Sequence, residues 1–326
     1  MMPENNIADI IFYPHLYDIH WARDLNRFLS GKFTTLLEPQ YAPWLKSRSL
    51  NHAYMAQLLP LLRQRPQSRL LLANAVDYSP DFAQYGYVSE IYAFVHSRHI
   101  LGESEPDAKR QLYEKNMLDM IDRLFVSTEC FERAIRRFLG FSFDDKIKVT
   151  GLPIFEPAQP PSGKDGILYP HRLSAMKGVE ELYCLPEDIL QRLVVCTPKF
   201  APQSVAKLRG LGVTVLANPS WSQYVEASLN CGLVLSTSRY ESFSYSILEN
   251  VMRGLMPVAP DSPTTCYADL LSPECLYINF DDLVDKLRYY TKHIKFRMAI
   301  VLGLQEKLAE RFGTDTFWQL LQEGVG

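Results

Sequence analysis

Short apolar runs alternate with amphipathic segments along the whole chain. In the first half, such runs predict strands at 9–13, 34–37, 69–73, 91–95, 123–126 and 146–149. In the second half, they predict strands at 165–169, 193–196, 213–216, 233–235 and 256–259. The clearest amphipathic stretches between strands are 107–121 and 128–139. Alternation of this kind is typical of parallel sheets covered by helices, so the pattern predicts an α/β, doubly wound architecture.

The two halves are separated by a proline-rich stretch. Residues 157–163 contain three prolines in seven positions, which is the composition of a linker. A chain of 326 residues also exceeds what one hydrophobic core usually serves. We therefore predict two domains, 1–156 and 157–292, followed by two helices in 293–326 that can cross back to the first domain. Such domains bind ligands at the carboxyl ends of their strands, in a cleft between them.

Composition narrows the classes of function. The chain is 47% hydrophobic and 22% charged, as in ordinary soluble enzymes, and its formal net charge is −3. The chain as a whole carries no excess of positive charge that would attract nucleic acid without specificity. A nucleic acid partner would therefore need a local patch of basic residues.

The sequence also predicts a cellular setting. The six cysteines show no metal-ligand spacing, which favours a reducing compartment. The first residues lack the features of a signal peptide, and no uncharged run approaches the roughly 18 residues of a membrane span. We expect a cytoplasmic protein without a membrane span.

Glu241 and Glu249 form the most informative motif. They stand where the apolar run 233–235 turns through small polar residues into a helix. Unpaired amides at a helix start can receive an anion such as a diphosphate. One carboxylate can then accept hydrogen bonds from sugar hydroxyls, while the second holds a ribose diol. The alternative is that both glutamates simply favour the helix.

Arg172 and Lys177 form a second candidate. They lie on the loop that leaves the strand 165–169 and precedes a predicted helix at 179–185. Both cations can converge on one phosphate group, since arginine offers a fork and lysine a point charge. The alternative is a pair of solvated surface cations.

Several histidines in the first domain are candidates for the opposite wall of the cleft. His96 and His99 follow the fourth predicted strand, and His96 could contact a sugar hydroxyl or move a proton near neutral pH. His15 and His20 follow the first strand and could meet the acceptor, or Asp18 between them simply caps the helix. A structural role is the alternative for each histidine.

Other chemistries lose support. The acidic pairs at 144–145 and 281–282 are not in an Asp-x-Asp arrangement, so we predict no catalytic metal. No glycine-rich dinucleotide fingerprint follows the first strand, and no Gly-x-Ser-x-Gly elbow occurs. The sequence therefore argues against a dinucleotide-dependent oxidoreductase and a serine hydrolase, and we expect no cofactor.

Taken together, these residues resemble the retaining glycosyltransferases of the GT-B fold, specifically the large family-4 group, across nearly the whole chain. The resemblance implies that Arg172 and Lys177, ahead of a glycine, clamp the diphosphate of a nucleotide sugar. It implies that Glu249 holds the ribose and Glu241 lies near the donor sugar. It also implies that His96 lies beside the donor sugar and the scissile bond, and that the first domain takes the acceptor.

A narrower likeness exists to the tRNA-queuosine mannosyltransferase family. It is carried by the segment 167–172, which ends in Pro-His-Arg, and by the block 235–249 followed by Pro-Val-Ala-Pro-Asp at 257–261. Two departures stand inside that block. Ser242 and Ser244 occupy positions where family-4 relatives usually carry glycine, and their Cβ atoms narrow the pocket.

These inferences combine into an expected function. We expect a retaining, metal-independent glycosyltransferase that uses a nucleotide sugar such as a GDP- or UDP-sugar, with help from the amides of Ser242, Phe243 and Ser244. The expected acceptor is a hydroxyl on a modified nucleobase of tRNA or DNA. The alternatives are a polysaccharide or lipid-linked glycan acceptor, or a non-catalytic module that binds a nucleotide or glycan.

Overall fold

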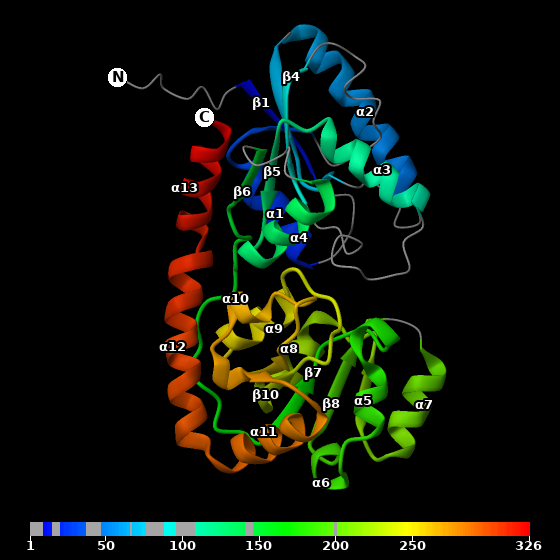
Figure 1. Ribbon diagram of the computed structural model, residues 1–326, viewed down its shortest axis with the longest axis vertical. Helices are drawn as coiled ribbons and strands as arrows, with labels where there is room; N and C mark the ends of the chain where they lie inside the picture. The colour runs from blue at the N-terminus through cyan, green and yellow to red at the C-terminus, as the bar shows by residue number, and fades with distance from the viewer. Residues whose placement is uncertain are drawn as a thin grey trace. The chain divides into compact units, whose positions relative to one another are not determined.

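The structure is a computed structural model that describes residues 9–14, 20–36, 47–65, 67–75, 88–95, 108–140, 146–198 and 201–326. For residues 20–21, 47–52 and 108–111 only the backbone is described. The chain divides into two compact units (Figure 1). Unit 1 comprises 1–100, 104–153 and 317–326, and unit 2 comprises 101–103 and 154–316.

Unit 1 is built on a six-stranded parallel sheet in the order β2-β1-β3-β4-β5-β6. Its strands are β1 (Ile10–Tyr13), β2 (Thr34–Thr35), β3 (Ser68–Leu72), β4 (Val88–Phe94), β5 (Arg123–Val126) and β6 (Ile147–Val149). All six coincide with predicted strands. β4 begins earlier than predicted because its first residues are partly or fully exposed, and an exposed strand end carries no apolar signal.

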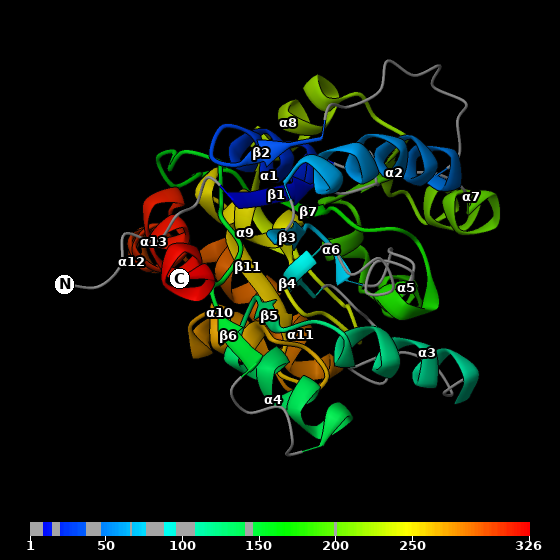
Figure 2. The ribbon, with the colours of Figure 1, turned by 90° about the horizontal axis from the view of Figure 1, so that it is seen from above.

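Helices cover both faces of this sheet. They are α1 (His20–Ser30), α2 (Ser47–Gln64), α3 (Ala108–Asp119), α4 (Glu129–Leu139) and α13 (Thr314–Val325). Figure 2 shows the strands of unit 1 in sheet order, with α13 on one side and α2 and α3 on the other. α13 is fixed there by the stacking of Phe317 on Phe94 at 5.8 Å and by a 2.6 Å bond from Arg123 to the Gly324 carbonyl.

Unit 2 repeats the architecture. Its six parallel strands lie in the order β12-β11-β10-β7-β8-β9. They are β7 (Gly166–Tyr169), β8 (Leu193–Thr197), β9 (Thr214–Ala217), β10 (Cys231–Leu235), β11 (Met256–Pro260) and β12 (Leu276–Tyr277). The first five were predicted, whereas β12 was missed because two residues are too few to form a pattern. Two parallel sheets covered by helices confirm the predicted fold class.

The helices of unit 2 complete it. They are α5 (Val179–Tyr183), α6 (Glu187–Leu190), α7 (Pro202–Gly210), α8 (Trp221–Leu229), α9 (Tyr245–Met252), α10 (Tyr267–Leu270), α11 (Phe280–Lys292) and α12 (Ile294–Phe312). Two 3-10 turns, η6 (Ala175–Lys177) and η7 (Pro273–Cys275), lie among them. α12 belongs to unit 2, and Gly313 separates it from α13.

The proline-rich stretch is anchored on unit 2. The Gln159 amide donates to the Met252 carbonyl at 2.6 Å, and the Ser162 amide donates to the Gly254 carbonyl at 2.8 Å. Gln305 on α12 donates to the Gln159 carbonyl at 2.8 Å. Proline interrupts helices and sheets, but the carbonyls and the neighbouring amides can still form hydrogen bonds. The proline-rich stretch is therefore held against unit 2 although its composition is that of a linker. The division between the units accordingly falls between 153 and 154.

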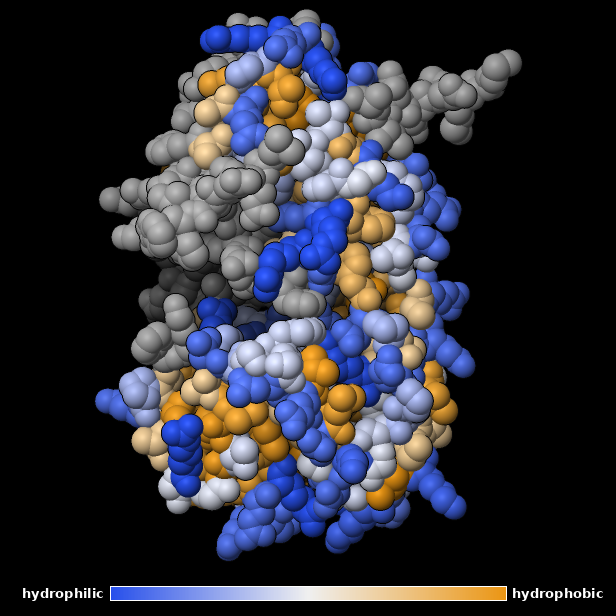
Figure 3. Space-filling model, turned by 180° about the vertical axis from the view of Figure 1, so that it is seen from behind, coloured by the Kyte–Doolittle hydropathy of each residue, from blue (hydrophilic) through white to orange (hydrophobic). Residues whose placement is uncertain are grey.

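The surface of unit 2 carries exposed apolar side chains, among them Trp221, Leu229 and Phe296. In Figure 3 its hydrophobic surface is interrupted by hydrophilic side chains. No helix in the described ranges is long and apolar enough to cross a membrane.

Candidate functional site

Strand order brings three loops of unit 2 together. β10 pairs with β7 on one side and β11 on the other, all parallel. Their carboxyl ends therefore open on one edge of the sheet, and the loops that follow them become neighbours. The Arg239 amide, after β10, donates to the Met176 carbonyl, after β7, at 2.9 Å. The Cys266 amide, after β11, donates to the Glu241 carbonyl at 2.8 Å, which ties the third loop to the same place.

Gly178 lets the first two loops touch. It has a φ of +66°, and a Cβ at this position would lie 2.9 Å from the Thr237 Cβ and still closer to the Thr237 carbonyl oxygen. The Thr237 hydroxyl donates to the carbonyls of Lys177, at 2.6 Å, and Gly178, at 3.1 Å. The Tyr169 hydroxyl also donates to the Lys177 carbonyl, at 2.5 Å. Only glycine combines this backbone conformation with such close approach, so the contact fixes the backbone of Lys177.

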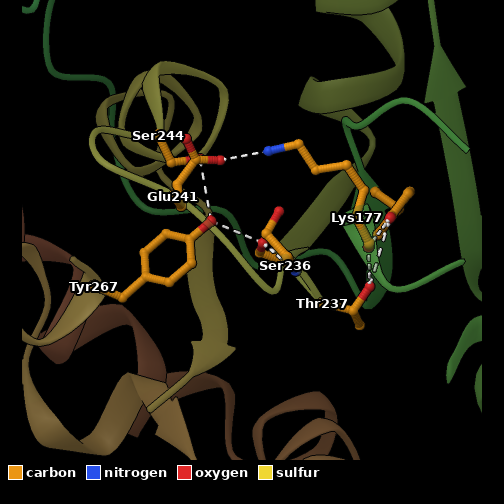
Figure 4. A network of polar contacts seen from close by, with 8 residues as sticks. Lys177, Ser236, Thr237, Glu241, Ser244 and Tyr267 are labelled. Carbon is orange, nitrogen blue, oxygen red and sulfur yellow. Dashed lines mark hydrogen bonds and ion pairs between the residues drawn. The ribbon is translucent and has the colours of Figure 1, made fainter. Parts of the chain in front are cut away.

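Lys177 and Glu241 meet across the two loops. The Lys177 Nζ lies 2.6 Å from Glu241 Oε2, as Figure 4 shows, and 14% and 16% of the two side chains are exposed. Glu241 is held in turn by its amide, which donates to the Thr264 carbonyl at 3.2 Å. The ion pair gives the mostly buried charge of Lys177 a carboxylate partner.

Arg172 and the residue before it face different surroundings. The Arg172 side chain is exposed, whereas His171 is 5% exposed and lies edge-on to Tyr169, with ring centroids 5.2 Å apart. No group in the described part of the chain bonds the His171 Nε2 atom. Burial lowers the pKa of His171 well below its usual range, and the charges of Lys177 and Arg172 lower it further. His171 is therefore a neutral core residue.

The start of α9 carries the polar residues predicted to supply amides. Ser244 is the N-cap, and its side chain makes no capping bond. Phe243 is 7% exposed and packs edge-on against Phe312 of α12, with centroids 5.3 Å apart. Ser242 is half-buried. Phe243 thus anchors the loop in the core, and Ser244, which begins α9 three residues after Glu241, lies beside Glu241 in Figure 4.

Glu249 lies half-buried in the second turn of α9. Its backbone carbonyl accepts the amide of Arg253, the C-cap of the helix. The seven-residue spacing from Glu241 therefore runs from the loop into the helix, as the sequence predicts.

Tyr267 is a site residue that sequence reasoning missed. It begins α10, is fully buried, and its hydroxyl lies 2.7 Å from Ser236 Oγ and 3.2 Å from Ser244 Oγ (Figure 4). Thr237 was missed as well. Each of these hydroxyls contacts a residue that is far from it in the sequence. No local spacing of residues therefore identifies them before the protein is folded.

The candidates from the first domain stay predictions. His15, His96 and His99 lie outside the described residues. His20 is the first residue of α1, and its side chain is also outside the description. Among the described residues, no three His, Cys, Asp or Glu side chains gather where they could hold a metal ion.

The burial of His171 predicts a pH dependence of stability. Below a pH of about 6.5 the histidine of the unfolded chain takes up a proton, while the buried histidine stays neutral. The unfolded state then binds more protons, so the free energy of unfolding should fall as the pH falls, by at most about 1.4 kcal/mol per pH unit. In His171→Asn this contribution should vanish. Denaturant unfolding of both proteins between pH 5 and 7 checks it, and equal pH dependence would contradict it.

Comparison with known proteins places the fold. No protein-family model matches the chain, and no curated protein matches its sequence. Solved structures do match. Sucrose-phosphate synthase from Thermosynechococcus elongatus is 14% identical with a TM-score of 0.72, covering 97% of this chain and 96% of that one. HepE from Anabaena, solved with UDP and glucose, is 15% identical with a TM-score of 0.70, covering 97% and 98%.

A third match is longer than this chain. TarM from S. aureus, solved with fondaparinux, alpha-GlcNAc-glycerol and UDP, is 15% identical with a TM-score of 0.66. The alignment covers 86% of this chain but 59% of TarM. These likenesses, together with two six-stranded parallel sheets, show that the chain has the GT-B fold.

Proposed function

We propose that this chain is a glycosyltransferase that moves a sugar from a nucleoside diphosphate sugar to an acceptor hydroxyl, with retention of the anomeric configuration. The observation that carries the proposal is the meeting of Lys177 and Glu241 beside the start of α9. A cation and a helix start next to each other suit a diphosphate. The fold supports it, because HepE and TarM of the same fold were solved with UDP.

Each candidate site residue of unit 2 has a role in the proposed reaction. Lys177, with exposed Arg172 near it in sequence, neutralises the diphosphate, and the first amides of α9 donate to its oxygens. Glu249, one turn into α9, accepts from the ribose hydroxyls, and Glu241 accepts from the donor sugar once the diphosphate engages Lys177. His96, with His15, His20 and His99, stays our proposal for the acceptor side.

The reaction breaks the bond between the anomeric carbon and the phosphate oxygen, and that oxygen keeps the electron pair. The acceptor oxygen bonds to the anomeric carbon, and its proton passes to the leaving phosphate. Charge therefore grows on the diphosphate in the transition state. Lys177 and the amides contribute most there, because their interactions strengthen as the charge grows.

For the acceptor we favour a glycan or a small polyol-linked sugar. TarM was solved with alpha-GlcNAc-glycerol, and another structure of the same fold is a sucrose-phosphate synthase. A modified nucleobase is the second candidate, carried by the Pro-His-Arg segment. In that segment His171 is buried against Tyr169, so a core requirement accounts for its histidine. Three arginines of α4, Arg133, Arg136 and Arg137, could contact a phosphate backbone, but Arg136 is paired with Glu132 at 2.7 Å.

The test uses a panel of UDP-, GDP- and ADP-sugars. Each is incubated with the protein alone, with oligosaccharide and lipid-linked acceptors, and with bulk tRNA or modified DNA. We expect slow release of nucleoside diphosphate from one donor, faster release with one acceptor, and an α-linked product from an α-linked donor by NMR. Binding of a nucleotide without release from any donor would instead support a non-catalytic module, and absence of both would refute the proposal.

A further inference from the structure

Among the described α-helices that begin at a serine, threonine or asparagine N-cap, Ser244 differs from the other three. Thr128, Ser220 and Asn279 each accept a hydrogen bond from an amide in the first turn of the helix they begin. Ser244 begins α9 without such a bond, although serine is among the best capping residues. Its ψ of 80° also differs from the extended values of 159°, 162° and 178° at the other three.

The Ser244 hydroxyl is held by Tyr267 instead. Tyr267 is the first residue of α10, which follows β11, and its hydroxyl lies 2.7 Å from Ser236 Oγ and 3.2 Å from Ser244 Oγ (Figure 4). The Tyr267 hydroxyl has one proton, which it donates between the oxygens of Ser236 and Ser244, with the shorter distance to Ser236. Burial raises the pKa of Tyr267 far above its usual value, and the nearby Glu241 charge raises it further. The phenol therefore stays neutral and keeps its proton for this network.

We propose that Tyr267 is a positioning residue that holds the Ser244 hydroxyl away from the first turn of α9. In that turn the Tyr245 amide donates to the Phe243 carbonyl at 3.2 Å and the Ile247 amide to the Ser244 carbonyl at 3.0 Å, so the amide left for a phosphate of the donor is that of Ser246. This inference rests on the proposed function, in which the start of α9 binds the diphosphate. Glycine at position 244 would have no hydroxyl to cap the helix and would leave the first turn uncapped by itself. The contact with Tyr267 explains how a serine can occupy this position with the same result.

The residues of this network are buried and tied to the neighbouring loop by a backbone hydrogen bond. Tyr267 is fully buried, and the Cys266 amide beside it donates to the Glu241 carbonyl. Ser236 and Ser244 are 0% and 2% exposed. Removing the phenol oxygen alone leaves the packing of the ring in place, so Tyr267→Phe isolates the hydrogen bonds.

The test is a double-mutant cycle read by nucleotide binding. In Tyr267→Phe the freed Ser244 hydroxyl should cap the helix and compete with phosphate. The Kd for UDP or GDP, whichever wild-type protein binds more tightly, should rise about fivefold, the equivalent of one capping bond. In a Ser244→Ala background the same change at 267 should alter Kd by less than about twofold. KM for the donor should follow Kd, while kcat changes less.

The control is Tyr290→Phe, which removes another buried tyrosine hydroxyl, bonded to the Glu274 carbonyl at 2.8 Å. It should leave nucleotide affinity unchanged. A purely structural role of Tyr267 would weaken binding equally with serine and with alanine at position 244. That result would overturn the proposal, as would an unchanged Kd in Tyr267→Phe.

A second measurement needs no ligand. Hydrogen exchange of the Ser246 amide should slow in Tyr267→Phe, because a capped amide is protected, and should return to its earlier rate when Ser244→Ala is added. Unchanged exchange would overturn the role of Tyr267. If wild-type protein bound neither nucleotide while exchange changed as expected, the proposed function would fail and the positioning role of Tyr267 would stand.

Discussion

Replacing Lys177 with alanine should lower the rate of sugar transfer by about 10²- to 10³-fold, the usual loss when one group that stabilises developing charge is removed. The structure gives the reason. The Lys177 Nζ is held 2.6 Å from Glu241 Oε2 beside the start of α9, and its backbone is fixed by Thr237 and Tyr169. Its charge is therefore held at one point. Rates of donor hydrolysis and transfer, with and without acceptor, measure the loss.

A double variant separates a role on the diphosphate from a role in structure. If Lys177 served only to neutralise Glu241, adding Glu241→Ala to Lys177→Ala would restore the melting temperature and the affinity for UDP or GDP that Lys177→Ala lost, because no buried carboxylate would be left unpaired. A role on the diphosphate predicts that nucleotide affinity stays as low in the double variant as in Lys177→Ala. Melting temperatures of all variants show whether the fold is kept. Near wild-type turnover in Lys177→Ala would refute the role of the lysine.

Gly178→Ala should destabilise unit 2 and abolish nucleotide binding together. An alanine there meets two costs, a left-handed backbone at φ +66° and overlap with Thr237. The first costs about 1–2 kcal/mol, and forced overlap in a packed site adds about 1–3 kcal/mol. Because the overlap pushes the two loops apart, it should also displace Lys177 from Glu241. We expect a lower melting temperature together with loss of nucleotide binding.

Gly212→Ala is the matched control for that variant. Gly212 has a φ of +82°, and nothing lies within 4 Å of where its Cβ would be. It therefore meets the backbone cost alone and should retain nucleotide binding. The difference between the two variants, measured by thermal unfolding and by isothermal titration with UDP or GDP, reports the contact with Thr237. Equal effects of the two substitutions would mean that loop contact contributes nothing.

Much of the framework was readable from the chain because it depends on local patterns. Short apolar runs marked eleven of the described strands, and the two helices expected in 293–326 are α12 and α13. The loop bearing Lys177 and the helix bearing Glu249 were found because each follows a strong strand signal. β12 was missed because its two residues lie below the length at which alternation can be recognised.

The candidate site was only partly readable. The sequence did not predict that Lys177 pairs with Glu241. The convergence of Lys177 and Arg172, whose side chain is exposed, on one phosphate stays a prediction. His171 gave a polar signal within a motif, yet it is buried and neutral. A polar residue in a loop is expected at the surface on average, and only the packing around it shows when it belongs to the core.

The sequence by itself determined the alternation of strands and helices, the division into two α/β units and the loops that carry charge, because hydrophobic periodicity and turn residues act over a few positions. Tertiary structure decided which loops touch. Lys177 and Glu241 are 64 residues apart, and Tyr267 lies 31 residues from Ser236. Strand order, with β10 between β7 and β11, brings them together. That order depends on how the whole sheet buries its faces, which no short segment encodes.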